Sequence, residues 1–437
     1  MIRRLECAEL IAPAGNLEKM RTAFAFGADA VYLGIPEFSL RVRINEFTSA
    51  QIKKAIAEAR SLKKKVYVTI NIFAHNKHLT KLPAYLKILK ELKVDALIIS
   101  DLGIIALVKK SWPEAKIHLS TQANCTNWSA AQFWQKQGVK RIVLGREVTL
   151  EEIKEIHQKC PKLELEYFVH GAMCMAYSGR CFLSKNFTGR SGNLGDCAQP
   201  CRWEYSLRET KVDGREMEIV EEEHGTYLLN SKDLCLIKYL DKLAAAGVTA
   251  FKIEGRAKSV YYQAVVVNAY RQAIEQIKNK KEKRKNSEIK KLFDELNTRL
   301  VHRGYTTGFL LDGKADENKK NSHEKSDWEF CGTVIANAVR DTSKIIHGKK
   351  YTVVLGDNNL SPEMMKVKVH NRMKIGDEIE IVRPFLPILK MKLTSMINAE
   401  TDKEITEAHG GGGGNIVIIE GDEEIPVFSV LRRKIEK

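Results

Sequence analysis

The chain has 437 residues, of which 44% are hydrophobic, and it carries 71 Lys and Arg residues against 55 Asp and Glu residues. This length is enough for two or three domains, and the formal charge of +16 favours polyanionic partners, nucleic acid first. No apolar run reaches the roughly 18 residues that a membrane-spanning helix needs, and the first residues show no signal-peptide pattern. We therefore expect a cytoplasmic protein without membrane contact.

Short apolar, β-branched runs alternate with helical patterns along the first part of the chain. The runs lie at 8–13, 29–35, 65–73, 95–101, 116–122, 141–147, 164–171 and 250–256. Capping residues open several of the intervening helical patterns, among them Asn16, Thr48 and Thr149. Eight β–α alternations predict an α/β fold, a (β/α)8 TIM-like barrel with buried strands. An open, doubly wound sheet is the alternative, because the number of strands does not establish closure.

The gap between the seventh and eighth runs is long and forms an insertion, 171–248, in a barrel domain that we assign to 1–310. The insertion leaves the seventh strand at its carboxyl end, and in barrel enzymes that rim carries the chemistry. Polar residues follow the strands at this rim: Asn71, Asp101, Gln122, Asn124, Arg146, His170, Glu254 and Arg256.

Within this set, the two arginines are predicted to bind a phosphate or carboxylate of the substrate, together with Asn71 and Gln122. His170 and Glu254 are predicted to be catalytic, as acid or base. Other interpretations stay open. The arginines can pair with neighbouring carboxylates such as Glu147, His170 can cap its strand end, and Glu254 can merely orient a guanidinium.

Two helical patterns follow the barrel strands, and the lysine-rich stretch 278–291 between them is predicted to be a mobile, solvated connection. After a polar linker, 311–330, we assign 331–437 to a small all-β, barrel-like domain. Its predicted strands lie at 332–339, 350–356, 365–370, 377–384, 388–393 and 415–420. The run Gly410–Gly414 is interpreted as a flexible hairpin loop, because a phosphate-binding loop would also need a following helix and Lys.

Four of the nine cysteines are clustered in the insertion: Cys174, Cys181, Cys197 and Cys201. Cytosolic thiols stay reduced, so metal binding is favoured over disulfides. The spacing C-x6-C-x15-C-x3-C suits tetrahedral zinc or an iron–sulfur cluster. Structural zinc usually shows tighter cysteine pairs, whereas a wide, glycine-rich loop can wrap a bulkier group, which gives the cluster a slight advantage. Four unrelated buried cysteines are the remaining alternative.

The stretch EYFVHGAMCMAYSGRCFLS, residues 166–184, matches the signature E-x-F-x2-G-[SA]-[LIVM]-C-x4-G-x-C-x-[LIVM]-S. It resembles the collagenase-like peptidase family of unassigned catalytic type. ELIAPAGNLEKM, NSKDLC, FKIEGRAKS and HRGYTTGF resemble that family as well, and the similarity spans residues 9–309. The stretch SLRVRINEF and the β domain look most like the branch that hydroxylates transfer-RNA uridine in a prephenate-dependent reaction.

The resemblance implies a [4Fe–4S] cluster on the four clustered cysteines, with zinc as the alternative metal. It also implies hydroxylation without molecular oxygen at the wobble uridine of transfer RNA, with prephenate as co-substrate. Ribosomal RNA and a quinone precursor are the other substrates that the family suggests, and its heteromeric members suggest a protein partner or electron donor. The 278–291 stretch and the glycine run depart from the best-known members and leave the substrate open.

A peptidase is the main alternative function, but the chain shows neither H-E-x-x-H nor G-x-S-x-G. A Cys–His protease is formally possible, with His170 four residues before Cys174, but cluster ligation would consume that thiol. A non-catalytic iron–sulfur subunit is a third class. Basic and aromatic residues alternate around the cysteines, as binding of unpaired RNA needs, although we expect at least half of these aromatics to close a small core around the cluster.

Overall fold

The computed structural model describes residues 8–35, 37–40, 47–203, 230–278, 282–311, 316–318, 323–338, 345–346, 349–350, 364–411, 415–421 and 423–435. Eight parallel strands close into a barrel, which confirms the predicted (β/α)8 fold and excludes the open sheet. They are β1 Glu9–Pro13, β2 Ala30–Gly34, β3 Lys65–Ile70, β4 Ala96–Ile99, β5 Ile117–Leu119, β6 Arg141–Val143, β7 Glu164–Ala172 and β9 Val248–Ile253. Closure occurs where β9 pairs with both β1 and β7, with Ala250 opposite Glu9 on one side and Glu166 on the other.

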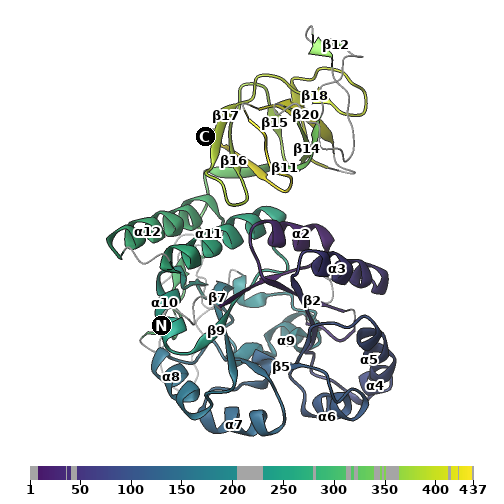
Figure 1. Cartoon of the computed structure of the whole chain (residues 1–437), viewed down its shortest axis with the longest axis vertical. Coiled ribbons are helices and arrows are strands. Elements are labelled where there is room, and N and C mark those ends of the chain that lie inside the picture. Colours follow the sequence, from purple (N-terminus) through teal and green to yellow (C-terminus); the bar gives the residue numbers. More distant parts are fainter. Residues whose placement is uncertain are drawn as a thin grey trace, which may run out of the picture.

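Helices surround the ring of strands, as Figure 1 shows. They are α2 Leu17–Ala25, α3 Ser49–Ser61, α4 Asn76–Leu79, α5 Leu82–Glu91, α6 Leu102–Ser111, α7 Trp128–Lys136, α8 Leu150–Lys159, α10 Leu240–Ala245 and α11 Val260–Lys278. The predicted caps are confirmed. Asn16 accepts a hydrogen bond from the Lys19 backbone, and Thr48 and Thr149 each form a capping box with the residue three positions on.

Charged side chains of four strands meet inside the barrel near its amino-terminal end. Arg141 Nη1 lies 2.6 Å from Glu9 Oε2 and 3.4 Å from Glu166 Oε2. The Lys252 ammonium pairs with the other oxygen of Glu166, and the Tyr67 hydroxyl donates to Glu9. All five residues are buried, and the two acids and two bases cancel in charge. These buried ion pairs fill the amino-terminal end of the barrel, and we call their network the ionic base of the barrel.

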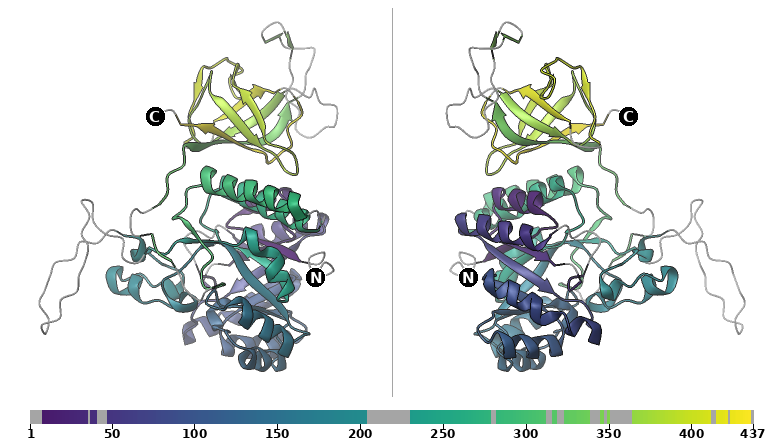
Figure 2. Two further views of the ribbon diagram at one scale, coloured as in Figure 1. Left: turned by 90° about the vertical axis from the view of Figure 1, so that its left-hand side faces the viewer. Right: turned by 90° about the vertical axis from the view of Figure 1, so that its right-hand side faces the viewer.

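The insertion begins at Gly171, whose φ of +109° and close approach to the Glu254 backbone leave no room for a side chain. Short elements follow: η3 Tyr177–Gly179, α9 Leu183–Thr188, η4 Gly192–Leu194 and η5 Pro200–Arg202. We call residues 173–203 the cap, because they extend from the carboxyl end of β7 to one side of the barrel (Figure 2). β8 Asp233–Cys235 then returns antiparallel to β7 and pairs with β10 Tyr305–Thr306.

The lysine-rich stretch differs from its prediction. Helix α12, Glu282–Arg299, covers most of 278–291, so this region is not a connecting loop. Its helical pairs, such as Lys291 with Glu288, account for the difference, because they stabilise a helix despite the high charge.

A seven-stranded antiparallel sheet forms the C-terminal domain, in the order β17-β16-β21-β11-β14-β20-β18. Its strands are β11 Trp328–Ala338, β14 Met364–Val369, β16 Glu378–Val382, β17 Leu389–Lys392, β18 Ile397–Asn398, β20 Ile416–Glu420 and β21 Val430–Lys434. Strands β18 and β21 of this sheet were not predicted, and most of the predicted strand at 350–356 lies outside the described residues. The same holds for residues 412–414 of the glycine run.

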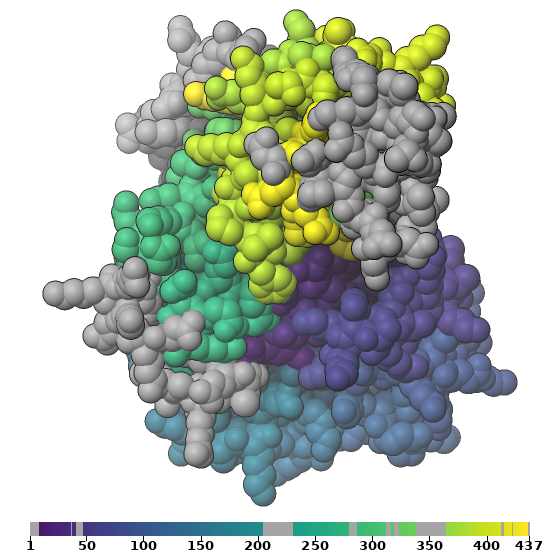
Figure 3. Space-filling view, turned by 45° about the horizontal axis from the view of Figure 1, so that its top comes forward, coloured from purple at the N-terminus to yellow at the C-terminus, as the bar shows by residue number. Residues whose placement is uncertain are grey.

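The C-terminal domain packs on helices of the barrel (Figure 3). The fully buried Arg432 of β21 pairs with Glu380 of β16 and with Glu295 of α12, and it donates to the Tyr261 hydroxyl of α11. Arg299 of α12 also approaches Glu380, at 3.6 Å. None of the helices in the described part of the chain combines the length and hydropathy that crossing a bilayer requires.

Candidate active site at the carboxyl end of the barrel

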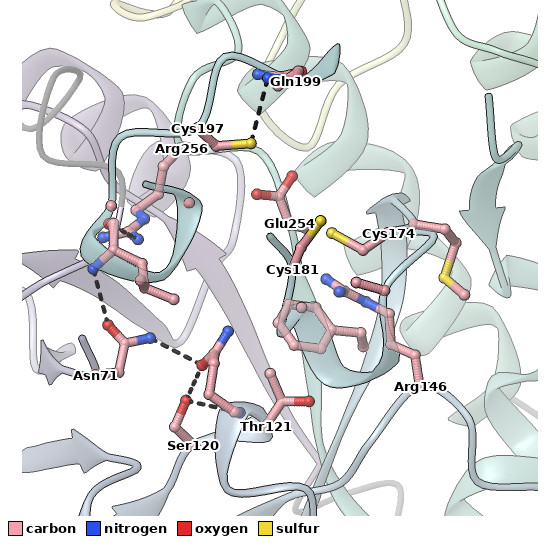
Figure 4. A pocket seen from close by; sticks show the side chains of 18 of the residues that line it. Asn71, Ser120, Thr121, Arg146, Cys174, Cys181, Cys197, Gln199, Glu254 and Arg256 are labelled. Atoms are coloured by element: carbon pink, nitrogen blue, oxygen red, sulfur yellow. Dashed lines mark hydrogen bonds between the residues drawn. The ribbon is translucent and has the colours of Figure 1, made fainter. Parts of the chain in front are cut away.

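A cavity of about 180 Å³ lies where the carboxyl ends of the barrel strands meet the cap. The strand side contributes polar groups, among them Asn71, Ser120, Gln122, Arg146 and Glu254. Figure 4 shows strand-end and cap side chains arranged around the same space. Since this is the end of a TIM-like barrel at which catalytic residues occur, the cavity is the candidate active site.

All four clustered cysteines line this cavity, and no other cysteine of the described chain does. Backbone N–H groups donate to two of their sulfurs: Leu183 N lies 3.4 Å from Cys181 Sγ, and Gln199 N lies 3.3 Å from Cys197 Sγ. Burial raises the pKa of the Cys201 thiol; Arg202 lowers it, and the nearby Cys174 and Cys197 thiols raise it. The tertiary structure therefore brings together thiols that lie up to 27 positions apart in the chain.

With their side chains in the observed orientations, the four cysteines do not form a metal-binding group. In the part of the chain that the structure describes, no three His, Cys, Asp or Glu side chains converge closely enough to hold a metal ion. The composition of the wall nevertheless fits an anionic, thiolate-ligated group. It offers four thiols, backbone N–H donors to two of the sulfurs and the guanidinium of Arg146, which has no carboxylate within ion-pair distance in the described residues. Ligation requires the thiols to turn toward a common point, so the cluster and its zinc alternative stay predictions.

A chain of hydrogen bonds fixes the orientation of two predicted substrate-binding residues. The Leu40 backbone N–H donates to Asn71 Oδ1 at 3.2 Å, so the Asn71 amide must present its nitrogen on the other side. Asn71 Nδ2 in turn donates to Gln122 Oε1 at 3.1 Å, and the Ser120 hydroxyl donates to the same oxygen. Both acceptor sites of Gln122 Oε1 are then used. Its Nε2 group meets no acceptor in the described residues and remains a donor at the cavity wall.

No carboxylate of the described chain lies within ion-pair distance of Arg146, whereas Lys252, another basic residue of the cavity, pairs with Glu166. The Arg146 guanidinium lies 3.9 Å from the centroid of the Phe168 ring, which holds it by a cation–π contact. Glu147, the neighbour that could have neutralised it, instead accepts from the backbone N–H of Ser178 in the cap at 2.6 Å. Arg146 is therefore a positive charge at the wall suited to an anionic ligand group.

Arg256 and Glu254 both line the cavity, but the guanidinium of Arg256 is engaged in hydrogen bonds within the protein. Its guanidinium donates to Ser39 Oγ at 2.8 Å and to the Leu40 carbonyl, and so it holds the segment that orients Asn71. Glu254 presents its carboxylate to the cavity (Figure 4), while its backbone carbonyl accepts from Tyr262. Glu254 is the one carboxylic acid among the described lining residues.

His170 does not reach the cavity. Its ring lies 5.4 to 5.8 Å from the ring centroids of Tyr262, Tyr270 and Tyr305, and it is 1% exposed. Burial lowers the pKa of the imidazole to about 3, so the ring is neutral near pH 7. The predicted acid–base role therefore has no access to the candidate site, because β7 turns this residue away from the cavity and into the packing beside β8.

Two further rim residues act within the fold. Asp101 caps α6 by accepting from Ile104 N, and Asn124 accepts from the Ser178 hydroxyl of the cap. Lys252 and Phe168, in contrast, line the cavity although they were not predicted. A lysine inside an otherwise apolar strand was the available signal for Lys252, whereas nothing in the sequence distinguished Phe168 from a core residue.

Comparison with known proteins places the chain in a family. The family model described as "Peptidase family U32" matches residues 15–320, and the model described as "Peptidase family U32 C-terminal domain" matches residues 352–432. The chain is 37% identical to "tRNA hydroxylation protein P" of Haemophilus influenzae, covering 98% of this chain and 96% of that protein. It is 35% identical to a 23S rRNA 5-hydroxycytidine synthase of Escherichia coli over 70% of this chain and 46% of that protein.

A further relative carries the name of a protease. The chain is 30% identical to "Collagenase" of Porphyromonas gingivalis, covering 88% of this chain and 89% of that protein. Proteins named for RNA hydroxylation and for proteolysis are thus both similar to most of this chain. On the extent of both matches, this protein belongs to peptidase family U32.

Proposed function

We propose that this protein is an RNA-modifying enzyme that hydroxylates C5 of the wobble uridine of transfer RNA without molecular oxygen, with prephenate as co-substrate and a [4Fe–4S] cluster on Cys174, Cys181, Cys197 and Cys201. The observation that carries the proposal is that one cavity is lined by these four thiols, by the guanidinium of Arg146 without an ion-pair partner in the described residues, and by the Gln122 amide donor. The similarity to proteins named for RNA hydroxylation supports the choice of substrate class.

The protein's own residues supply recognition and positioning. Arg146 is suited to bind a carboxylate of the co-substrate or a phosphate beside the target nucleotide. Gln122 Nε2 is suited to donate to a carbonyl oxygen of the base, and Asn71 holds it in that orientation. Glu254 is placed to hold or release a proton at the cavity wall. A [4Fe–4S] cluster on the four thiols would supply one-electron chemistry.

Hydroxylation exchanges the C5–H bond of the base for C5–OH, which oxidises the base by two electrons. The net change is the insertion of one oxygen atom between carbon and hydrogen. The balance therefore requires a co-substrate that gives up one oxygen atom and is reduced by those two electrons, while one hydrogen stays on the new hydroxyl. We place prephenate in this role. A carboxylate of prephenate suits the guanidinium of Arg146, which lines the cavity and has no carboxylate within ion-pair distance in the described residues.

A peptidase is the second candidate, since one relative is named a collagenase. Thiol proteases need an imidazole beside the nucleophile. Among the described residues that line the cavity there is no histidine, and His170 is enclosed by three tyrosines. The geometry therefore favours a modifying enzyme over a Cys–His peptidase.

Nucleoside analysis of transfer RNA tests the proposal. Cells that lack the gene are expected to lose 5-hydroxyuridine derivatives, and a copy of the gene should restore them. A Cys174→Ala copy should fail to restore them, and the variant purified without oxygen should have lost its iron. Cys331→Ala is the matched control, because Cys331 is buried in the C-terminal domain away from the cavity.

The outcomes separate the alternatives. A wild-type protein that is iron-free when purified without oxygen removes the cluster from the proposal. An unchanged transfer-RNA profile together with loss of a ribosomal RNA or quinone hydroxylation would move the substrate to that class. Cleavage of a collagen-like peptide by metal-free protein, abolished in Cys174→Ala, would establish the peptidase instead.

A further inference from the structure

The cap bears an unusual concentration of exposed aromatic side chains. Of the seven large aromatic residues that are exposed in the described part of the chain, four lie within the cap: Tyr177, Phe182, Phe187 and Trp203. Phe182 is 77% exposed, and the Phe187 and Trp203 rings lie edge to face at 6.5 Å. The expectation that at least half of the aromatics around the cysteines would close a core is therefore wrong for the described ones, Phe182, Phe187 and Trp203. Exposed rings on this scale mark a binding surface.

These rings border the candidate active site. Phe182 lies between Cys181 and Leu183, both of which line the cavity, and Trp203 follows the lining residue Arg202. Tyr177 follows Ala176, which also belongs to the wall. Three of the four exposed rings of the cap therefore belong to residues that are next in sequence to the cavity wall.

The charge of the cap is strongly positive. Its 31 residues include Arg180, Lys185, Arg190 and Arg202 but only one acidic residue, Asp196, which pairs with Arg190 at 3.0 Å. The exposed Lys185 contacts the Gly189 carbonyl, and Arg180 donates to the Gln122 carbonyl at the cavity edge. Basic groups interleaved with exposed rings suit a nucleic acid whose bases are unpaired, because each base can stack while its phosphate meets a cation.

We propose that the cap is the platform for the unpaired nucleotides that flank the target base in an RNA loop. The proposal rests on the proposed function, because it assumes that the cavity receives one base. Cap residues such as Cys181, Leu183 and Arg202 form part of the cavity wall, so nucleotides next to a base in the cavity would lie close to the cap. Stacking of those nucleotides on Phe182 and Trp203 compensates for the unstacking of the base that enters.

A duplex cannot use this surface in the same way, because its bases are stacked on one another and present only edges and backbone. A hydrophobic protein segment could cover the rings, but the basic residues among them would then lose solvent without a counter-charge. The observations therefore favour single-stranded RNA over a protein partner.

Binding measurements on the purified full chain test the platform. The probes are a 17-nucleotide hairpin with a seven-nucleotide, uridine-containing loop and a duplex of the same length without a loop. Phe182→Ala and Trp203→Ala are each expected to weaken hairpin binding about 10-fold, the order of one lost base–aromatic stack. Phe133→Ala is the matched control, because Phe133 is 49% exposed on α7 and lies outside the cap. It should leave the affinity unchanged.

A second variant tests the electrostatic part. Lys185→Gln should reduce the slope of log affinity against log salt by about 0.7, the value for one phosphate contact on a single strand. Lys110→Gln, at an exposed position of α6, should not alter the slope. Thermal unfolding of each variant verifies that the fold is retained.

The platform would be overturned if neither Phe182→Ala nor Trp203→Ala changed the affinity for the hairpin. This is also the result expected if the cap binds a protein instead of RNA. Equal affinity for the duplex and the hairpin would also overturn the platform. The proposed function has a separate readout. Cap variants that restore all 5-hydroxyuridine in cells would defeat the platform alone. Cap-dependent hairpin binding with an unchanged nucleoside profile in the deletion strain would defeat the proposed reaction alone.

Discussion

The two ends of the barrel interior contain similar side chains in opposite circumstances. At the amino-terminal end, Arg141 and Lys252 are neutralised by Glu9 and Glu166 in close ion pairs. At the carboxyl end, Arg146 faces a cavity with no ion-pair partner in the described residues, and Gln122 keeps a free donor. Charge that is paired and buried holds the strands in register, whereas charge that is left open is available to a ligand.

The difference follows from the geometry of a parallel barrel. Each strand begins at the same end, so Glu9, at the start of β1, and Arg141, at the start of β6, point into the same narrow lumen. Loops and the cap enter at the other end and widen it into a cavity. Substitutions at the closed end should therefore change stability, and those at the open end should change binding or activity.

The largest effect is expected at the closed end. Arg141→Met should lower the free energy of unfolding by about 3–5 kcal/mol, because it leaves Glu9 and Glu166 buried without their shared partner. Urea titration measures the change. Lys90→Met is the control, since its pair with Glu114 is exposed and screened by solvent and should contribute far less. Similar losses in both variants would mean that the ionic base does not stabilise the barrel.

A smaller effect, on activity rather than stability, is expected at the open end. Gln122→Glu should lower kcat/KM for hydroxylation about 100-fold, close to 2.7 kcal/mol, because a donor to the base becomes an acceptor that repels its carbonyl oxygen.

Gln122→Ala is the comparison for this prediction. It removes the donor without adding a charge, and so it should lose less activity than the Glu variant. Steady-state rates on transfer RNA decide the point. Equal rates in both variants would show that Gln122 does not contact the base.

The smallest effect is expected for His170, and it concerns how the free energy of unfolding depends on pH. It tests whether this residue belongs to the packed interior and not to the candidate active site. Burial lowers the pKa of its imidazole to about 3, compared with about 6.5 in an unfolded chain. Between these values the unfolded chain binds more protons, so the stability that depends on neutral His170 is complete above pH 6.5 and decreases as the pH falls. At pH 5 the loss is about 2 kcal/mol.

Urea unfolding at pH 7.5 and pH 5 compares the wild type with His170→Gln. The variant should lose about 2 kcal/mol less than the wild type between the two pH values, and its hydroxylation activity at pH 7.5 should be retained. An equal acid loss in both proteins would contradict the burial of His170. A variant that is folded but inactive would return the residue to the catalytic site.

Particular residues show how far the sequence allowed the site to be predicted. The cysteine spacing identified the four thiols that line the cavity, and strand ends identified Asn71, Gln122 and Arg146. His170 follows the same pattern but lies among tyrosines, because a strand places successive side chains on opposite faces and the β8 pairing closes that side. Lys252 was missed because its partner, Glu166, lies 86 positions away in the sequence.

The sequence by itself determined the elements: eight apolar runs, their capped helices and a cysteine-rich insertion at one strand end. These depend on local periodicity and capping, which are readable along the chain. Only the tertiary structure decided that β9 closes the ring, that Arg141 is neutralised while Arg146 is not, and that the cap turns its aromatic rings outward. Such outcomes depend on contacts between residues far apart in sequence, and local patterns carry no information about which partner each side chain meets.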